Sequence, residues 1–242
     1  MTSIAVVVSG TFQYRSPAGS ELMTPGSLLL GNAGACFCCR HEHGTGDRCL
    51  AFSYEAELLE RIGFDAGASD ALFPVPRLPA SRVLAPLVAK ALAFHAGDPG
   101  VNGEELGVEL AAQAIRMARG AWSPLSVRAE PGALARVSRV VRMIDNEPDI
   151  PHGLANLARF ARLSPYHFLR TFEALTGTTP HQYLMRARLR RAALRLRTEP
   201  SRILDIALDC GFGDVSNFNR AFRAEFGVTP RSYRAESQTS RL

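Results

Sequence analysis

The sequence contains no long apolar run. No segment approaches the roughly 20 consecutive apolar residues of a membrane-spanning helix. Residues 4–8 are apolar, but they are too few for a secretory signal and no basic residue precedes them. We interpret them as a strand and expect a cytoplasmic protein without a membrane partner. With 46% hydrophobic and 21% charged residues among 242, the chain can bury a core in one large domain or two small ones.

The sequence also lacks the arrangements that carry enzymatic chemistry. It has no Ser-His-Asp pattern, phosphate-binding glycine loop or pair of carboxylates at a convincing spacing. Lysine is almost missing, because Lys90 is the only lysine among 28 basic residues, but we give this arginine bias little weight. We therefore predict that the chain is not an enzyme.

Cysteine is scarce outside one segment. Four of the five cysteines lie within residues 36–49, and this spacing argues against a secreted disulfide framework. Because thiolate and imidazole groups bind zinc and other transition metals, a metal cofactor is one interpretation, with the candidate ligands Cys36, Cys38, His41, His43 and Cys49. A redox sensor, with thiolates activated by Arg40 and Arg48, is a second. A strand, a turn and a strand with small buried cysteines and solvated histidines is the third.

The positive charge is confined to the C-terminal part of the chain. Residues 1–132 contain 10 basic and 13 acidic side chains, whereas residues 133–242 contain 18 basic and 10 acidic ones. A basic region within a chain whose net charge is only +5 is typical of a protein that binds nucleic acid.

The chain divides into four segments of different pattern. Residues 4–55 are rich in β-forming residues and turns, and residues 74–80 form a proline-rich break. Ser81 is placed to cap a helix that runs to about residue 95, and a second helix is predicted over residues 103–118. Its stripe of Leu106, Leu110, Ala114 and Met117 is either core or the face of a homodimer. Residues 119–132 are predicted as a linker, and the pattern is helical from residue 133 onward.

An internal repeat is the most informative feature. Residues 168–172 and 177–180 recur as residues 218–222 and 227–230, and Tyr183 recurs as Tyr233, all at an offset of 50. Upstream, residues 157–158 recur as residues 206–207 at an offset of 49. The second copy therefore contains one additional residue between its first helix and the following turn.

Each copy has the pattern of a helix-turn-helix unit. A first helix, residues 154–161 or 203–210, is followed by a short turn and by Ser164 or Asp214, either of which can cap a second helix. Phenylalanines occupy one face of the second helix, and the polar face opposite suits the major groove of DNA. Cys210 lies on the apolar side and is predicted to be core. The predicted DNA-binding residues are Ser164, Tyr166, His167, Arg170, Asp214, Ser216, Asn217, Asn219, Arg220 and Arg223.

Residues 180–197, between the two copies, predict an arginine-rich helix. A helix of this length spans ~27 Å, which lets two recognition helices enter successive major grooves ~34 Å apart if helix width and tilt supply the difference. We expect two or three of its arginines to contact phosphates and the others to make no specific contact.

With these features, residues 136–234 resemble the DNA-binding domain of the AraC/XylS family of bacterial transcription regulators. The resemblance is carried by residues 157–172, 206–223 and 226–234, the last reading Phe-Gly-Val-Thr-Pro-Arg-Ser-Tyr-Arg. It implies a seven-helix domain that binds double-stranded promoter DNA, usually as an activator, with RNA polymerase as a partner. The base readers that it implies are Tyr166, Leu169 and Arg170 in the first unit and Val215, Ser216, Asn217, Asn219 and Arg220 in the second.

Residues 26–37 resemble the later half of a cupin barrel, which is the usual effector-binding module of that family. Phe37 occupies the place of the usual histidine, so we do not expect an ordinary cupin metal site. Only 25 residues precede this segment, and we expect either an incomplete barrel or a truncated start. The effector that this module implies is a small molecule, a metal or an oxidant.

The predicted fold class is therefore α+β. A partial cupin-like β segment (1–80) precedes a helical hairpin for dimerisation (81–118), a linker (119–132) and an all-α domain with two helix-turn-helix units (133–242). Two other classes stay open. One is a metal-binding or DNA-alkylation-response protein with an activated cysteine nucleophile. The other is a structural helical repeat, which predicts no salt-dependent DNA binding.

Overall fold

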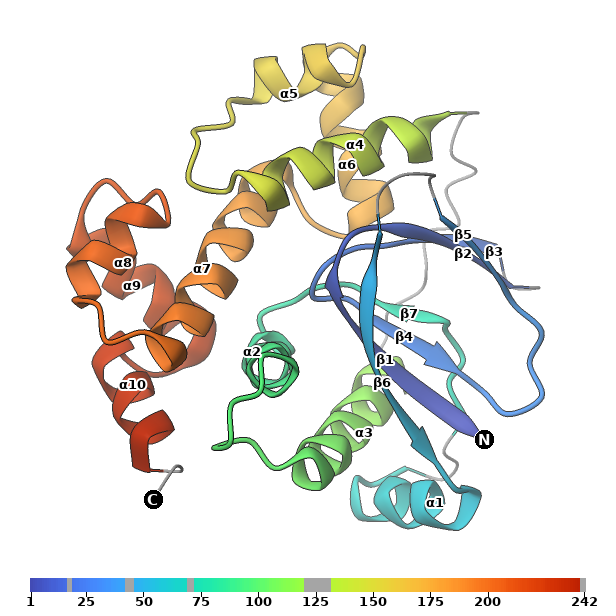
Figure 1. Cartoon of the computed structure of the whole chain (residues 1–242). Coiled ribbons are helices and arrows are strands. Elements are labelled where there is room, and N and C mark those ends of the chain that lie inside the picture. The colour runs from blue at the N-terminus through green and yellow to red at the C-terminus, as the bar shows by residue number, and fades with distance from the viewer. Residues whose placement is uncertain (17–18, 42–45, 69–71, 120–131, 240–242) are drawn as a thin grey trace.

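In the computed structural model, residues 1–16, 19–41, 46–68, 72–119 and 132–239 are described, and they form a β-rich N-terminal module beside a helical domain (Figure 1). The strands are β1 (Thr2–Ser9), β2 (Phe12–Ser16), β3 (Gly19–Met23), β4 (Leu28–Gly31), β5 (Cys38–His41), β6 (Arg48–Tyr54) and β7 (Arg77–Leu78). The helices of the module are α1 (Ala56–Asp65), α2 (Ala85–His95) and α3 (Gly103–Arg119). No helix of the described residues is long and apolar enough to cross a membrane.

Two antiparallel sheets pack face to face in the N-terminal module. One has the strand order β6-β1-β4-β7 and the other has the order β3-β2-β5. Side chains alternate along β1, so Ile4 and Val6 face the helices whereas Val7 faces Phe12 and Tyr14 of the second sheet. The β-rich prediction for residues 4–55 is confirmed, but the cupin-like detail is not.

Helices α1, α2 and α3 cover the other face of the first sheet. Leu59 of α1, Val88 of α2 and Leu106 of α3 belong to the same core as β1 and β4. The predicted apolar stripe on α3 thus packs inside this module, where Leu110 and Ala114 are fully buried. This burial removes the stripe as a dimerisation face.

Three local predictions for this module were wrong or incomplete. Helix α2 begins at Ala85 rather than after Ser81, and its N-cap residue, Leu84, makes no side-chain capping bond. The Ser81 carbonyl instead accepts a hydrogen bond from the Leu84 amide in a preceding turn. The proline-rich break contains strand β7, and helix α1 was not predicted at all. The predicted linker lies almost wholly outside the described residues.

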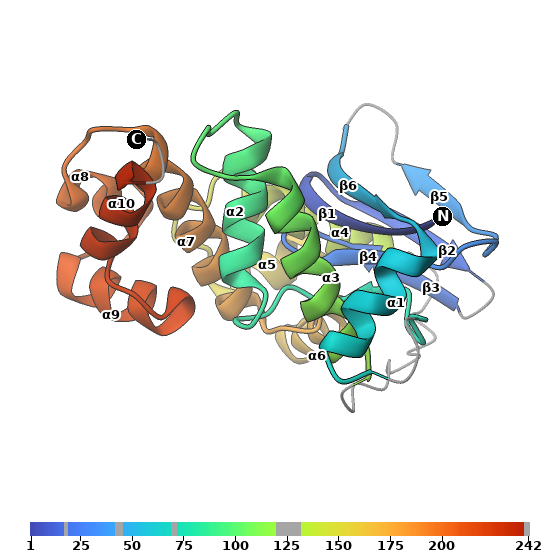
Figure 2. The same cartoon turned by 90° about the horizontal axis from the view of Figure 1, so that it is seen from below.

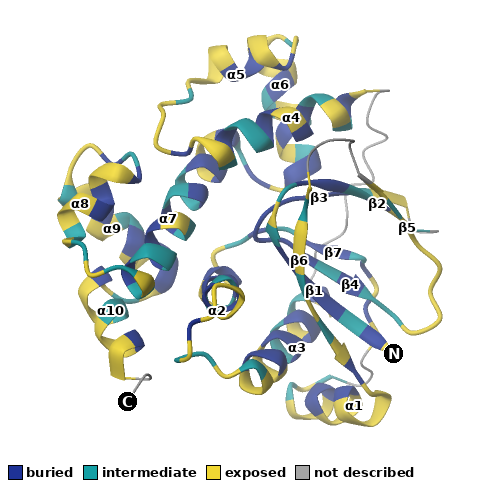
Figure 3. Cartoon of the chain, viewed as in Figure 1, coloured by how far each residue is buried: buried dark blue, intermediate teal, exposed yellow. Residues whose placement is uncertain are grey.

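Seven helices form the described part of the chain from residue 132 onward, as the family resemblance implied. They are α4 (Ala133–Asn146), α5 (Leu154–Phe160), α6 (Pro165–Thr176), α7 (Pro180–Thr198), α8 (Ile203–Asp209), α9 (Val215–Phe226) and α10 (Pro230–Thr239). Helix α7 is buried or half-buried along most of its length, whereas α5 and α8 expose most of their residues (Figure 3). One core gathers α4, α5 and α6 at the start of α7, and a second gathers α8 and α9 farther along it.

The N-terminal module packs directly against the helical domain. Leu22 of β3 is part of the core formed by α4 to α7, and Ala85 and Ala89 of α2 are part of the core formed by α7 to α9. Alanines allow the α2 and α7 backbones to approach closely. A buried ion pair adds to this interface, with Arg197 Nε 2.7 Å from Asp98 Oδ2 and both side chains less than a tenth exposed.

Candidate nucleic-acid interface

The two helix-turn-helix units are α5–α6 and α8–α9, within one residue of the predicted bounds. The turn after each first helix contains one left-handed residue, Arg162 with φ 55° in the first unit and Gly211 with φ 87° in the second. The amides of the next residues, Leu163 and Phe212, donate to equivalent carbonyls of α5 and α8. The repeat offset is 49 up to this point and 50 from the cap onward, so the additional residue of the second unit is Gly213.

Each second helix is capped by the residue that the sequence indicated. Ser164 Oγ accepts a hydrogen bond from the His167 amide at 3.4 Å. Asp214 Oδ1 accepts one from the Asn217 amide at 2.7 Å. Both caps satisfy amides that would otherwise lack a partner at the start of a helix. The capping prediction is confirmed, and the two side chains serve their own helices in the absence of DNA.

The outward face of α6 presents an aromatic ring, an imidazole and a guanidinium. Tyr166 is 64% exposed, and its ring lies edge-on to His167. Arg170 Nη1 donates to Tyr166 Oη at 3.2 Å. This hydrogen bond is the main cause that raises the pKa of Arg170. Leu169 is half-buried, so it contributes little to this face.

The outward face of α9 is richer in hydrogen-bonding groups. The predicted residues Ser216, Asn217, Asn219, Arg220 and Arg223 are all exposed. Arg220 Nη2 reaches Asn217 Oδ1 at 3.5 Å. Val215 is half-buried, which agrees with a minor part in recognition. Helices α6 and α9 lie on the same side of the molecule, toward the lower edge of Figure 2.

The inward faces of α6 and α9 explain the aromatic part of the repeat. The rings of Phe168, Phe172 and Tyr183 pack in sequence in the first unit, the first pair tilted and the second edge-to-face. Their counterparts Phe218, Phe222 and Tyr233 do the same in the second. In the first unit the Tyr183 hydroxyl also donates to Asp145 Oδ2 at 2.6 Å, and burial raises the pKa of Tyr183 so that it stays protonated. These aromatic side chains anchor the inward faces of α6 and α9 in the two cores of the domain.

The Gly-X-Thr-Pro repeat joins each recognition helix to the next helix. Gly177 and Gly227 are left-handed, with φ 78° and 80°, and they end α6 and α9. Thr179 then caps α7 in a capping box with Gln182. Proline occupies the first helical position, where its missing amide costs little. Four residues therefore specify a helix stop and a helix start, which explains why they recur at a fixed offset.

The arginines of α7 have partners inside the chain. All six of the arginines between residues 186 and 197 form a hydrogen bond or an ion pair with another residue, namely Arg186, Arg188, Arg190, Arg191, Arg195 and Arg197. The expectation that most of them make no specific contact was wrong. They connect α7 to α4 and the α4–α5 connection, to the second helix-turn-helix unit and to the N-terminal module.

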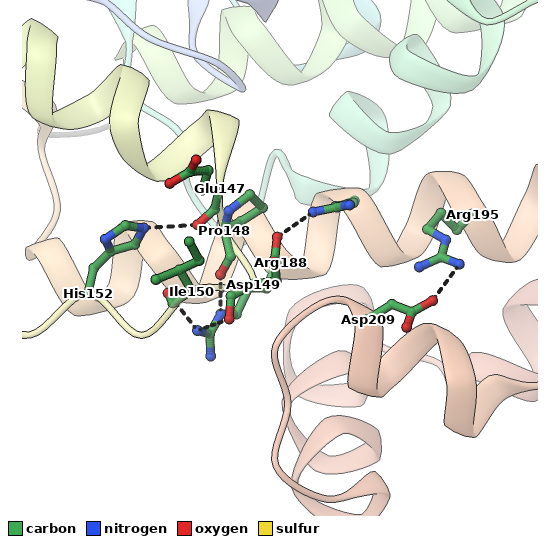
Figure 4. Close-up of polar contacts among 9 residues, drawn as sticks. Glu147, Pro148, Asp149, Ile150, His152, Arg188, Arg195 and Asp209 are labelled. Atoms are coloured by element: carbon green, nitrogen blue, oxygen red, sulfur yellow. Dashed lines mark hydrogen bonds and ion pairs between the residues drawn. The ribbon is translucent and has the colours of Figure 1, made fainter.

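Arg188 is the most highly connected of these arginines (Figure 4). Its Nε donates to the Pro148 carbonyl at 2.6 Å and its Nη1 donates to the Gly211 carbonyl at 2.7 Å. Its Nη2 donates to the carbonyls of Asp149 and Ile150 at 3.3 and 3.2 Å. The guanidinium therefore joins the α4–α5 connection to the turn of the second unit. Farther along α7, Arg195 forms an ion pair with Asp209 of α8 at 2.9 Å.

The cysteine segment does not form a metal site among the residues described. Cys36, Cys38 and Cys49 are exposed free thiols. His43 and the side chain of His41 lie outside the described residues, and the described residues contain no group of three His, Cys, Asp or Glu placed to hold a metal ion. Metal binding stays a prediction.

The prediction of activated thiolates is wrong at the two cysteines of this segment whose pKa is shifted. Desolvation by neighbouring protein atoms and then the charge of Asp47 raise the pKa of the half-buried Cys39, and they raise that of Cys49 to about 11 although its surface is still partly open to solvent. The predicted effect of Arg40 and Arg48 is therefore outweighed at these two thiols. Cys210 is fully buried, as predicted, and burial raises its pKa as well. None of these three thiols is an activated nucleophile of the kind that a DNA-alkylation-response enzyme needs.

Comparison with known proteins identifies the helical domain. A family described as a helix-turn-helix domain matches residues 157–236. SoxS of Salmonella typhimurium is 35% identical over 98 residues, which are 40% of this chain and 92% of SoxS. MtrA of Neisseria gonorrhoeae is 28% identical over 101 residues, which are 42% of this chain and 34% of MtrA. The crystal structure of the AdpA DNA-binding domain with a target DNA is 29% identical and covers 44% of this chain and 96% of that one, with a TM-score of 0.43.

The matches concern the C-terminal part of the chain. The chain spans about a third of the length of MtrA, but it covers nearly the whole of SoxS. The matched family is one of DNA-binding transcription regulators and not of enzymes. The repeated helix-turn-helix geometry and the extent of the match to SoxS together show that the chain belongs to the AraC/XylS family of transcription regulators.

Proposed function

We propose that the chain regulates transcription by binding promoter DNA with α6 and α9 in successive major grooves. The observation that carries this proposal is the exposure of two polar helix faces on one side of the molecule. The N-terminal module contacts other sides of α6 and α9 and leaves these polar faces exposed. Helix α7, which joins the units, has 19 residues and is therefore ~28 Å long, of the same order as the ~34 Å between successive grooves.

The second unit supplies more of the direct base recognition in this proposal. Asn219 and Asn217 carry amides that can pair with an adenine edge, and Arg220 can bind guanine with two parallel hydrogen bonds. In the first unit Arg170 is the corresponding guanine reader, with Tyr166 and His167 beside it. Four further exposed residues lie beside these readers, and we propose that they contact the phosphate backbone or position the helices on it: Ser164, Asp214, Ser216 and Arg223.

The N-terminal module is the proposed sensor. Two antiparallel sheets packed face to face agree with a cupin-like module that binds a small molecule, a metal or an oxidant, although its ligand is not identified. Membership of the family supports RNA polymerase as a partner. A homodimer is compatible with the fold only through a surface other than the buried stripe of α3.

The proposal is tested by separating specific from nonspecific binding. A duplex is first selected from a random library by the wild-type protein, and its affinity is compared with that of a scrambled duplex. Arg220→Ala and Arg170→Ala are each expected to weaken binding to the selected duplex by about 1–3 kcal/mol and to leave the scrambled duplex less affected. Arg116→Ala is the matched control, because Arg116 lies on α3 and bonds to Gln113, far from the proposed interface.

Two results would contradict the proposal. Equal losses on both duplexes would mean that the two arginines contact only phosphates. If the wild-type protein shows no preference for any duplex, then the proposed sequence-specific recognition is wrong. Salt dependence gives an independent check, because binding that rests on arginine–phosphate attraction falls steeply as salt rises.

A further inference from the structure

One segment of the N-terminal module contacts the C-terminal ends of both recognition helices. Residues 79–82, here called the strap, follow strand β7 directly. Pro79 lies against Gly177, the residue that ends α6, so closely that a Cβ added at Gly177 would lie 2.8 Å from Pro79 Cβ. The strap therefore touches the first recognition helix where it ends, through a position that tolerates only glycine.

The strap reaches the second recognition helix through charged groups. Glu225, in the last turn of α9, is only 9% exposed. Its Oε1 lies 3.3 Å from Arg186 Nε of α7, and its Oε2 lies 3.7 Å from Arg82 Nε of the strap. Arg186 Nη1 also donates to the Ala80 carbonyl at 2.9 Å. One guanidinium thus holds the strap and α9 together on α7.

The same guanidinium also reaches the end of α6. Arg186 Nη1 lies 3.3 Å from Thr178 Oγ1, and Thr178 follows the glycine that ends α6. Arg186 is therefore bonded to residues beside the ends of both recognition helices. A planar guanidinium with several fixed donors can hold such a geometry, whereas a lysine ammonium cannot.

The contact region is closely packed and not a ligand site. The cavity lined by Ala80, Arg186, Glu225 and Phe226 has a volume of only about 10 Å³. This volume holds one water molecule at most. Ala85 of α2, which begins three residues after the strap, belongs to the same core as Phe226. Because the two sides of the interface are closely packed, a displacement of one side can be transmitted to the other.

We propose that the strap, with Arg186 and Glu225, is a positioning device that fixes the angle between α6 and α9 and hence the spacing of the two DNA half-sites. The proposal rests on the proposed function. The 12-residue helix α9 is ~18 Å long, so a small tilt at its anchored C-terminal end displaces the DNA-facing residues near its N-terminus. A sensor that moves β7 would alter DNA recognition through this route.

The test measures selectivity for half-site spacing in the full chain. Affinities are measured for the duplex selected by the wild-type protein and for versions with one base pair added or removed between its two halves. Glu225→Gln is expected to reduce the ratio between native and altered spacing at least about twofold, the low end of the coupling seen within one interaction network. Arg82→Ala, at a side chain 66% exposed, changes the ratio in the same direction without endangering the fold.

The matched control is Glu109→Gln, which removes the same charge from the Lys90–Glu109 pair of α2 and α3. It should leave the spacing ratio at the wild-type value. The inference is overturned if Glu225→Gln and Arg82→Ala both keep the wild-type ratio, or if they weaken all spacings equally. A wild-type protein that selects no duplex would instead refute the proposed function, so the two failures are distinguishable.

Discussion

Replacing Arg188 by lysine tests whether this arginine holds the α4–α5 connection against the turn of the second helix-turn-helix unit. Arg188 donates four hydrogen bonds to backbone carbonyls, two of them at 2.6 and 2.7 Å. Lysine keeps the charge but not the planar fork, and it can reach only some of these carbonyls. A net hydrogen bond to a charged group contributes about 1.5–3 kcal/mol when its partner is desolvated. Arg188 is half-buried and water replaces part of the loss, so we expect Arg188→Lys to lower the free energy of unfolding by about 2 kcal/mol.

Urea denaturation followed by circular dichroism measures this change, and the midpoint of thermal unfolding should fall by roughly 4–8 °C. Arg191→Lys, on the same helix, is the matched control. Arg191 and Asp149 are each more than 40% exposed, and such surface pairs contribute about 0.5 kcal/mol. If Arg188→Lys is as stable as Arg191→Lys, then the four carbonyl contacts do not stabilise the domain and this account of α7 is wrong.

Three further substitutions or probes test other parts of the structure. Gly211→Ala should destabilise the chain by about 2–4 kcal/mol, because φ is 87° and the new Cβ would lie 2.6 Å from the Asp149 carbonyl oxygen. The control is Arg162→Gly at the equivalent turn, whose free energy of unfolding should stay within about 1 kcal/mol of wild type. Equal effects of the two substitutions in urea denaturation would contradict this prediction. Asp98→Asn should cost about 3 kcal/mol in thermal unfolding, because it leaves Arg197 buried without its charged partner, and an unchanged midpoint would refute it. A pKa of about 11 against an ordinary 9.0 lowers the thiolate fraction of Cys49 at pH 8 about 100-fold, but a thiolate of higher pKa is also a stronger nucleophile. Cys49 should therefore react with iodoacetamide about tenfold more slowly in the native chain than in urea. Mass spectrometry of its peptide measures both rates, and equal rates would contradict the shift.

The repeated unit could be predicted from the sequence because its signals are local. A cap, a proline, a left-handed glycine and phenylalanines at helical spacing each specify structure within a few residues. The bounds of α5, α6, α8 and α9 follow from them, and so does the exposed polar face of each recognition helix.

The role of the α7 arginines could not be predicted in the same way. Arg188 binds backbone carbonyls about 40 residues before it, and Arg186 binds the carbonyl of Ala80, 106 residues away. Every residue has a backbone carbonyl, so the sequence does not indicate which carbonyls an arginine will bind. The arginine-rich helix was therefore interpreted as largely solvated. The burial of the α3 stripe has a similar origin, because its amphipathic pattern does not say which surface covers it.

Two of the wrong predictions for the N-terminal module could have been avoided, because the sequence contains local signals for α1 and for the start of α2. Helix α1 buries Leu59 and Ile62 at helical spacing, and Pro86 marks the first turn of α2 better than Ser81 does. Strand β7 has only two residues and pairs with Leu28 and Leu29 of β4. So short a strand between prolines depends on its neighbour and not on its own propensity.

The most direct test of the central claim is the selection of duplexes from a random library by the wild-type protein. The account predicts an enriched motif with two conserved blocks whose centres lie about 10 base pairs apart, one for α6 and one for α9. An enriched motif with a single block, or no enrichment above random DNA, would contradict the claim that two helix-turn-helix units read DNA together.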